Sequence, residues 1–325
     1  KGCGVRRRLA SLAIESSPRT RGALVLLAFI PIIQILMNKQ PFKSGFAVLI
    51  GRSNVGKSTL LNTLVGTKVA ITTPKPQTTR FPIQGVVHDD RGQIVFVDTP
   101  GVMQKAKDEL TKKLLDSVRQ SLHDIDVLIY VVDPTRQIGN EEKQTLKMIE
   151  GVDKPKLLVI NKVDERSAQR NIDFYRDLLE DHFDGAIELS ALKGTNMDIL
   201  KDWIFEHLPE GDAYYEKSQI SNIGNKERIA ELIREKLFLR LREEVPYSVH
   251  VDVHEIEERK NGIMYIRADV LTTEDRYKRM IIGKGARGIK EISQSTRNEL
   301  ENVTGKKIFL DMEVKVDSHW VNRFN

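Results

Sequence analysis

The sequence predicts a doubly wound α/β domain with a mostly parallel sheet, followed by a smaller α+β domain. Over residues 42–212, short apolar strand patterns alternate with helical patterns, which is typical of a parallel sheet covered by helices. Over residues 225–320, the patterns run helix, strand, strand, helix, strand. A chain of 325 residues has room for about two domains of ordinary size.

Composition narrows the class of protein. With 40% hydrophobic and 30% charged residues, the chain is neither disordered nor collagen-like. Its single cysteine, Cys3, excludes a disulfide framework and a cysteine-based metal cluster. Charge is unevenly distributed: residues 1–41 carry a net charge of +6 and the rest of the chain −1. A nucleic-acid site must therefore be sought in local clusters of charge.

Residues 1–41 resemble a leader more than a part of the fold. Three consecutive arginines precede an apolar run of about 16 residues, 22–37, which Pro31 interrupts. A membrane-spanning helix needs roughly 20 residues. Three interpretations stay open: an upstream extension of a protein that starts at Met37, a targeting or anchoring segment, and a structural element. We leave these residues out of the fold prediction.

The first domain opens with a phosphate-binding motif. An apolar strand pattern at 46–50 leads into Gly-x-x-x-x-Gly-Lys-Ser, and a helical pattern follows. This strand–loop–helix context is that of a P-loop, whose glycines let backbone N–H groups surround a phosphate at the helix N-terminus. Lys57 is expected to reach the β- and γ-phosphates, and the Ser58 hydroxyl to bind Mg²⁺. The predicted phosphate contacts are Gly51, Asn54, Val55, Gly56, Lys57, Ser58 and Thr59.

Two further segments predict contacts to Mg²⁺ and the γ-phosphate. The next strand pattern ends in Asp-Thr-Pro-Gly, where Asp98 is placed to hold Mg²⁺, usually through water, and the Gly101 amide to sense a γ-phosphate. Residues 69–80 are polar and lack helical or strand periodicity, which suits a loop ordered by γ-phosphate and Mg²⁺. Thr79, or with less support Thr78, provides the second hydroxyl ligand.

A third group of residues selects the base. A strand pattern at 156–160 ends in Asn161-Lys162-Val163-Asp164. The Asp164 carboxylate accepts hydrogen bonds from N1–H and the exocyclic amine of guanine, which adenine does not offer. Asn161 belongs to this tetrad, and the stem of Lys162 lies along the ring. After the last strand pattern, the backbone N–H groups of Ser190, Ala191 and Leu192 are placed to meet the guanine O6. The sequence therefore predicts a GTP site.

Hydrolysis needs an unusual arrangement, because Val102 stands where many GTPases place a water-orienting glutamine. Asn54 offers a side-chain oxygen to a monovalent cation, and K⁺ beside the phosphates would stabilise developing charge. The alternative is that Asn54 only stabilises its own turn. The predicted catalytic residues are Lys57, Thr79, Gly101 and Asn54.

The second domain carries a local basic cluster. Residues 276–307 have a net charge of +6, and a Gly-rich loop enters the helical pattern 289–303. A Gly-rich turn beside basic side chains at a helix N-terminus is how KH modules clamp single-stranded nucleotides. A solvated helix with a capping turn is the alternative. The predicted RNA contacts are Ile282, Gly283, Lys284, Gly285, Ala286, Arg287 and Lys290.

Taken together, the motifs FKSGF, PKPQTTR, DTPGV, NKVD, SALKGTN and IIGKG…GKKIFLDMEVKV resemble those of the Era family of bacterial and organellar GTPases over residues 42–320. The resemblance implies a Ras-like GTPase domain at 42–212, a linker at 213–224 and a type II KH domain at 225–320. It also implies a hydrophobic residue at the glutamine position, as in Val102, and K⁺ use by relatives with an asparagine like Asn54.

Partners follow from the same resemblance. It implies GTP, GDP and Mg²⁺ as ligands, binding of 16S-type rRNA near its 3′ end, and a role in assembly of the small ribosomal subunit. We expect a cytoplasmic monomer, with peripheral association with the inner membrane face and organellar targeting left open. The alternative function is a GTP-gated membrane-surface protein anchored by residues 1–41. A GTPase acting on tRNA or the large subunit is disfavoured by the single GTPase domain, and an ATPase by Asp164.

One residue departs from the family pattern. The KH loop of the family reads Gly-x-x-Gly, whereas Ala286 follows Gly283-Lys284-Gly285 here. If that position requires positive φ, alanine is strained by roughly 1 kcal/mol or more. A shifted frame, Gly285 to Gly288, would restore the spacing but misplace the helix start. We therefore expect weakened RNA binding or an altered loop.

Overall fold

The structure is a computed structural model that describes residues 41–102 and 109–323. The predicted leader, residues 1–41, therefore lies outside the described residues except for Pro41. From Phe42 onward the described chain forms one compact unit. Within these ranges, none of the helices combines the length and apolar character needed to cross a bilayer.

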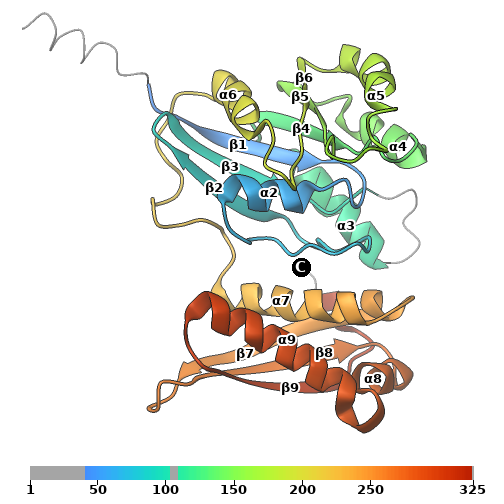
Figure 1. Cartoon of the computed structure of the whole chain (residues 1–325), viewed down its shortest axis with the longest axis vertical. Helices are drawn as coiled ribbons and strands as arrows, with labels where there is room; N and C mark the ends of the chain where they lie inside the picture. Colours follow the sequence, from blue (N-terminus) through green and yellow to red (C-terminus); the bar gives the residue numbers. More distant parts are fainter. Residues whose placement is uncertain (1–40, 103–108, 324–325) are drawn as a thin grey trace, which may run out of the picture. The chain divides into compact units, whose positions relative to one another are not determined.

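The first half contains a six-stranded sheet (Figure 1). Its strands are β1 (Lys43–Ile50), β2 (Ile83–Asp89), β3 (Gly92–Asp98), β4 (Val127–Val132), β5 (Lys156–Ile160) and β6 (Gly185–Glu188). They lie in the order β2-β3-β1-β4-β5-β6. β2 pairs antiparallel with β3, and every other pairing is parallel. This confirms the predicted mostly parallel sheet.

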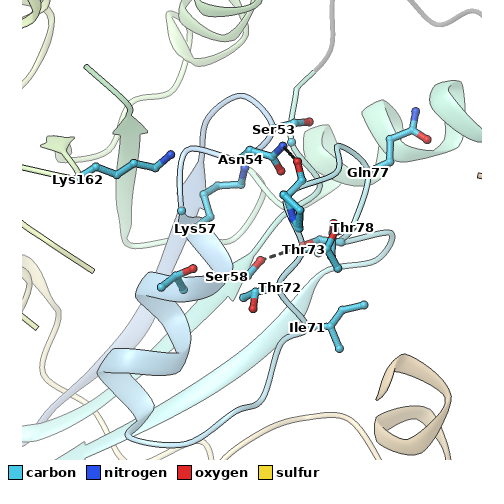
Figure 2. A pocket seen from close by; sticks show the side chains of 15 residues that line it. Ser53, Asn54, Lys57, Ser58, Ile71, Thr72, Thr73, Gln77, Thr78 and Lys162 are labelled. Atoms are coloured by element: carbon cyan, nitrogen blue, oxygen red, sulfur yellow. Dashed lines mark hydrogen bonds between the residues drawn. The ribbon is translucent and has the colours of Figure 1, made fainter. Parts of the chain in front are cut away.

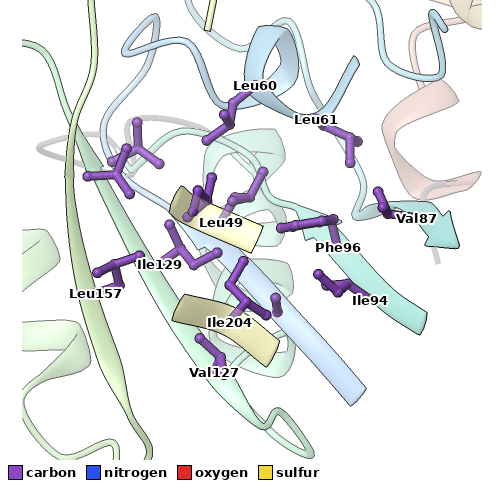
Figure 3. Packing of buried hydrophobic residues seen from close by; sticks show 14 of the residues in the cluster. Leu49, Leu60, Leu61, Val87, Ile94, Phe96, Val127, Ile129, Leu157 and Ile204 are labelled. Atoms are coloured by element: carbon purple, nitrogen blue, oxygen red, sulfur yellow. The ribbon is translucent and has the colours of Figure 1, made fainter. Parts of the chain in front are cut away.

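Helices cover both faces of this sheet, because neighbouring residues of a strand point to opposite sides. The helices are α2 (Lys57–Val65), α3 (Glu109–Gln120), α4 (Asn140–Ile149), α5 (Ile172–Leu179) and α6 (Met197–His207), with a 3₁₀ turn at Glu180–His182. Leu49 packs with Leu60 and Ile204 on the face of α2 and α6 (Figure 3), whereas Val48 and Ile50 pack on the face of α3, α4 and α5. The central strand β4 is buried along its whole length, as expected for a strand covered on both sides.

The predicted linker, 213–224, is tied to the edge of the sheet. Gly85 forms an isolated bridge with Ser221, and the Val86 N–H donates to the Ile220 carbonyl at 3.0 Å. The Gln84 N–H donates to Asn222 Oδ1 at 2.9 Å. These contacts pair part of the outer edge of β2, which would otherwise expose unpaired backbone groups.

The second half is a three-stranded sheet with helices packed on one face. The elements are α7 (Asn225–Arg240), β7 (Val249–Glu258), β8 (Met264–Thr272), α8 (Asp275–Ile282), α9 (Arg287–Thr304) and β9 (Ile308–Val316), with 3₁₀ turns at Val245–Ser248, Lys284–Ala286 and Trp320–Arg323. The strand order is β7-β8-β9; β7 and β8 are antiparallel, and β8 and β9 are parallel. α8 was not predicted, because eight residues give too short a pattern. The α/β and α+β classes are both confirmed.

Candidate functional site: a nucleotide pocket and a Gly-rich loop

A pocket of about 370 Å³ lies between the P-loop and loop 69–80 (Figure 2). The predicted residues that line it are Asn54, Gly56, Lys57, Ser58, Thr59, Thr79, Gly101 and Lys162. Ser53, Gln77, Thr78 and the segment 71–74 complete the lining. The other predicted residues do not line this pocket: Gly51, Val55, Asp98, Asn161, Asp164, Ser190, Ala191 and Leu192.

The P-loop conformation explains one of its glycines. Gly56 has φ +101°, a region that side chains disfavour, and a Cβ there would lie 2.3 Å from Asn161 Nδ2. The Asn161 amide also donates to the Val55 carbonyl at 2.8 Å. The base-recognition strand and the phosphate loop therefore hold one another in register.

Lys57 is buried at the floor of the pocket. Its ammonium donates to the carbonyl oxygens of Gly51 and Arg52, each at 3.0 Å. Burial lowers the pKa of Lys57 to about 8, and the nearby Asp98 carboxylate opposes that shift. Phosphate oxygens at the mouth of the loop would meet a cation that is already positioned.

Three predicted Mg²⁺-binding residues meet directly. Ser58 Oγ donates to Asp98 Oδ2 at 2.6 Å, Thr79 Oγ1 donates to the same oxygen at 3.2 Å, and the two hydroxyl oxygens lie 3.1 Å apart. Burial raises the pKa of Asp98, while Lys57 opposes the shift. The other carboxylate oxygen, Oδ1, is buried without a hydrogen-bond partner among the described residues.

This donor set fits a hard cation. Mg²⁺ prefers oxygen ligands and retains several waters. Two hydroxyls beside one carboxylate supply such oxygen ligands. A bound cation would also compensate the buried carboxylate. Thr78, the weaker candidate, instead donates to the Lys75 carbonyl at 2.8 Å and hydrogen-bonds with Thr73.

The base-recognition segments converge beside the P-loop. Ser190 Oγ donates to Asp164 Oδ1 at 2.6 Å, which orients the carboxylate predicted to read guanine. The Ala191 N–H donates to Asn161 Oδ1 at 2.9 Å. Asn161 therefore joins the two segments, and the Ala191 donor expected for the guanine O6 already has an acceptor. Leu192 is 73% exposed.

Val102 is fully buried against the core, and its N–H donates to the Gly51 carbonyl at 3.1 Å. Its side chain therefore offers nothing polar to an attacking water, as the sequence indicated.

Arg52 of the P-loop forms a buried ion pair with Glu142 that the sequence did not predict. Arg52 Nε lies 2.6 Å from Glu142 Oε1, and both side chains are almost completely buried. Arg52 also donates to the carbonyl oxygens of Asp133 and Gln137. Breaking one partner of such a pair is strongly destabilising because it leaves a buried charge uncompensated. No local spacing reveals a pair of residues so far apart in the chain.

The Gly-rich loop of the second half adopts left-handed backbone conformations. Gly283, Gly285 and Ala286 have φ of 71°, 59° and 59°. Ala286 is the N-cap of α9 and has the positive φ that would strain an alanine at this position. Gly288 lies inside α9, where a Cβ would sit 2.4 Å from the Ile281 carbonyl oxygen. The shifted glycine frame is thus not the loop of this structure.

Some predicted RNA contacts gather on one shallow groove and others do not. Gly285, Arg287 and Lys290 line a groove of about 630 Å³ along α9. Lys284 is exposed at the tip of the loop, whereas Ile282 packs partly against the domain core.

These features define a P-loop nucleotide-binding protein. Its base-recognition segment carries a carboxylate, Asp164, of the kind that guanine recognition requires. Residues 46–162 match the family model described as 50S ribosome-binding GTPase, and residues 244–321 match that of the KH domain. GTPase Era of Halothermothrix orenii is 42% identical over 279 residues, which cover 86% of this chain and 95% of the relative. GTPase Era of Carboxydothermus hydrogenoformans is 42% identical over 289 residues, or 87% and 95%. The chain belongs to the Era family of GTPases.

Two solved structures extend the similarity to the fold. One is a crystal structure of Era with MgGDPNP and nucleotides 1506–1542 of 16S ribosomal RNA, 35% identical with a TM-score of 0.81 over 87% of this chain and 96% of the other. The other is an Era variant of Aquifex aeolicus bound to GDP·AlF₄⁻, with the same identity, TM-score and coverage. As a member of this family, the chain is a GTPase with a C-terminal KH domain.

Proposed function

We propose that the pocket hydrolyses GTP with Mg²⁺ held by Ser58, Thr79 and, through water, Asp98. Gly51, Asn54, Val55, Gly56, Lys57, Ser58 and Thr59 would contact the phosphates, and Gly101 the γ-phosphate. Asp164 would read guanine, with Asn161, Lys162 and residues 190–192 around the base. The shared hydrogen bonds among Ser58, Thr79 and Asp98 support the metal assignment, as does the Mg²⁺ bound with GDPNP in the similar Era complex.

We further propose that K⁺ bound at the Asn54 side chain assists GTP hydrolysis. The Asn54 Nδ2 donates to the Pro74 carbonyl at 2.7 Å, so an amide and a carbonyl group meet beside the phosphate pocket. If the amide turns, its oxygen and the Pro74 oxygen would both face a monovalent cation. Such a charge would stabilise the transition state in place of the missing glutamine.

The same proposal includes binding of 16S-type rRNA near its 3′ end and action in assembly of the small ribosomal subunit. One observation carries it: a structure with TM-score 0.81 to this chain holds both a GTP analogue and that part of 16S rRNA. The exposed Lys284, Arg287 and Lys290 beside the Gly-rich loop supply the positive charge that phosphates require.

An RNA-binding titration tests this assignment. The full chain, saturated with GDPNP, is titrated into a fluorescent RNA with the 3′-terminal sequence of 16S rRNA and into a scrambled RNA of equal length. We expect tight binding to the first RNA and a loss of about tenfold on Lys284→Glu. Lys260→Glu, the same charge change in the exposed β7–β8 turn, is the matched control. Equal binding by both variants, or equal affinity for both RNAs, would refute the assignment.

We propose the domain limits 42–212, 213–224 and 225–320 and a monomeric state. The alternative of an anchored membrane-surface protein depends on residues outside the described ranges and stays a prediction. Association with the inner membrane face, which the family resemblance implies, also stays a prediction. A cytoplasmic location likewise stays a prediction.

A further inference from the structure

Arg80, the last residue of loop 69–80, is 2% exposed although it carries a permanent charge. Its guanidinium donates to the Val249 carbonyl at 2.6 Å and to the carbonyls of Pro246 and Tyr247, each at 3.2 Å. All three acceptors lie in the C-terminal half, in and just after the 3₁₀ turn 245–248. The planar fork of arginine suits several acceptors at fixed directions.

Two aromatic rings also lie near this cation. The Arg80 Cζ lies 5.6 Å from the centroid of the Phe238 ring and 5.2 Å from that of Trp320. A guanidinium at this range is attracted to the ring face, and more strongly so when water is excluded. We call the three carbonyl groups and the two rings the arginine box.

Trp320 is itself held firmly. It is 1% exposed, its indole N–H donates to the Ser248 carbonyl at 3.0 Å, and its ring stacks on His250 at 5.5 Å with an interplanar angle of 5°. It also packs with Leu110 and Leu114 of α3. The 3₁₀ turn Trp320–Arg323 therefore supplies one ring of the arginine box. The same turn also contacts α3, the helix that follows the Asp-Thr-Pro-Gly segment.

Further contacts fix the rest of loop 69–80 to the same part of the chain. The Lys75 ammonium donates to the Leu241 carbonyl at 2.5 Å and to the Phe238 carbonyl, at the end of α7. The Thr72 N–H donates to Glu235 Oε1 at 3.3 Å. The loop that carries Thr79 is thus attached to residues 235–249 at several points.

Thr79 and Arg80 are consecutive, so their Cα atoms are about 3.8 Å apart. An anchor on Arg80 therefore restricts where the Thr79 hydroxyl lies relative to Ser58 and Asp98. We propose that Arg80 is a positioning residue for GTP hydrolysis: the arginine box, built by the C-terminal half, holds Thr79 in place for Mg²⁺. This inference rests on the metal role proposed for Thr79.

The expected consequence separates hydrolysis from nucleotide binding. A loop threonine that completes the Mg²⁺ site is needed with GTP, whereas GDP is held by the P-loop and the base segments. Displacing a catalytic group by about 1 Å costs up to about 100-fold in rate. Loss of the anchor should therefore lower kcat and raise the Mg²⁺ concentration needed for half-maximal turnover, with little change in GDP affinity.

The test compares Arg80→Lys and Trp320→Ala with the wild-type full chain. We expect each variant to lose roughly ten- to a hundredfold in kcat and to need several-fold more Mg²⁺, while the Kd for a fluorescent GDP analogue stays within about twofold. Trp320→Phe keeps a ring against Arg80 and should recover most of the rate. The double variant Arg80→Lys/Trp320→Ala should be no slower than the worse single variant, because both changes remove one anchor.

Arg91→Lys is the matched control, because Arg91 also stacks on an aromatic ring, at 4.4 Å from the Phe205 centroid, but belongs to the far end of β2–β3. It should hydrolyse GTP like the wild type. The inference is overturned if Arg80→Lys and Trp320→Ala keep wild-type kcat and Mg²⁺ dependence, or if their rates fall only in step with GDP affinity. Thr79→Ala separates the two proposals: if its Mg²⁺ dependence is unchanged, the metal role of Thr79 fails whatever the Arg80 variants do.

Discussion

Asn54 and Pro74 both line the nucleotide pocket, and the Pro74 carbonyl oxygen accepts the Asn54 Nδ2–H at 2.7 Å. Asn54 has φ +65°, a conformation that asparagine tolerates better than most residues. The contact joins the P-loop to loop 69–80, so the two segments that would surround a monovalent cation are already in contact.

Replacing Na⁺ by K⁺ should raise GTP turnover, because a desolvated cation beside the phosphates stabilises developing negative charge. We expect a gain of about tenfold in kcat, which corresponds to ~1.4 kcal/mol of transition-state stabilisation. The measurement is steady-state hydrolysis at constant ionic strength. In Asn54→Ala the two salts should give nearly equal rates. Equal rates in the wild type would remove the cation role of Asn54.

Asp164→Asn should exchange the base preference. An amide at this position offers a donor where guanine presents its own N–H groups, and xanthine presents an oxygen at that place. We expect GTP to bind about 100-fold more weakly, since buried polar groups are left unpaired, and XTP to bind more tightly than GTP. Competition against a fluorescent nucleotide measures both.

Asp177→Asn, the same substitution at an exposed position of α5, should leave both affinities unchanged. If Asp164→Asn kept the wild-type preference for GTP, the carboxylate would not read the base.

Ala286→Gly should stabilise the C-terminal half. Ala286 has φ +59° and ψ +20°, where an L-residue with a Cβ is strained by roughly 1 kcal/mol relative to glycine. Urea unfolding should show that gain in the free energy of unfolding. Gly285→Ala is the reverse change next to it, at φ +59° and with open space around a Cβ, so it should cost about the same amount. Equal midpoints for both variants would contradict the assignment of strain.

Much of the nucleotide site could be predicted because its residues act through local spacing. Gly51 to Ser58 form one strand–loop–helix turn, and Asp98 ends a neighbouring parallel strand. Since the carboxyl ends of parallel strands meet at one edge, the contact of Ser58 with Asp98 follows from the sequence pattern. The left-handed position of Ala286 could be anticipated for a similar reason, as it ends a glycine-rich loop before a helix.

The remaining features depend on residues far apart in the chain. Arg80 and Val249 are separated by 169 positions, and a carbonyl acceptor has no sequence signature. Asn161 could be assigned to base recognition, but its bonds to Val55 and Ala191 show that it also holds two loops together. The pairing of Ile220 and Ser221 with β2, and the hydrogen bond from Gln84 to the Asn222 side chain, could likewise not be predicted from a polar segment.

His250 should make the stability of the fold depend on pH. Burial lowers the pKa of His250 below its ordinary value of 6.5, and the cations Arg80 and Arg234 lower it further, while Asp252 opposes the shift. The folded state thus binds this proton less readily than the unfolded chain. The free energy of unfolding should therefore be highest above pH 6.5 and fall as the pH drops through 6.5 toward the lowered folded pKa.

Urea unfolding at a series of pH values between neutral and mildly acidic conditions measures this dependence. His250→Gln removes the titrating group, so the slope of unfolding free energy against pH should be shallower in this window than in the wild type. His182→Gln alters an exposed histidine on the other half of the chain and should keep the wild-type slope. Because His250 stacks on Trp320, its protonation also places a charge beside the arginine box. If His250→Gln kept the wild-type slope, burial of the neutral imidazole would not be the source of acid sensitivity.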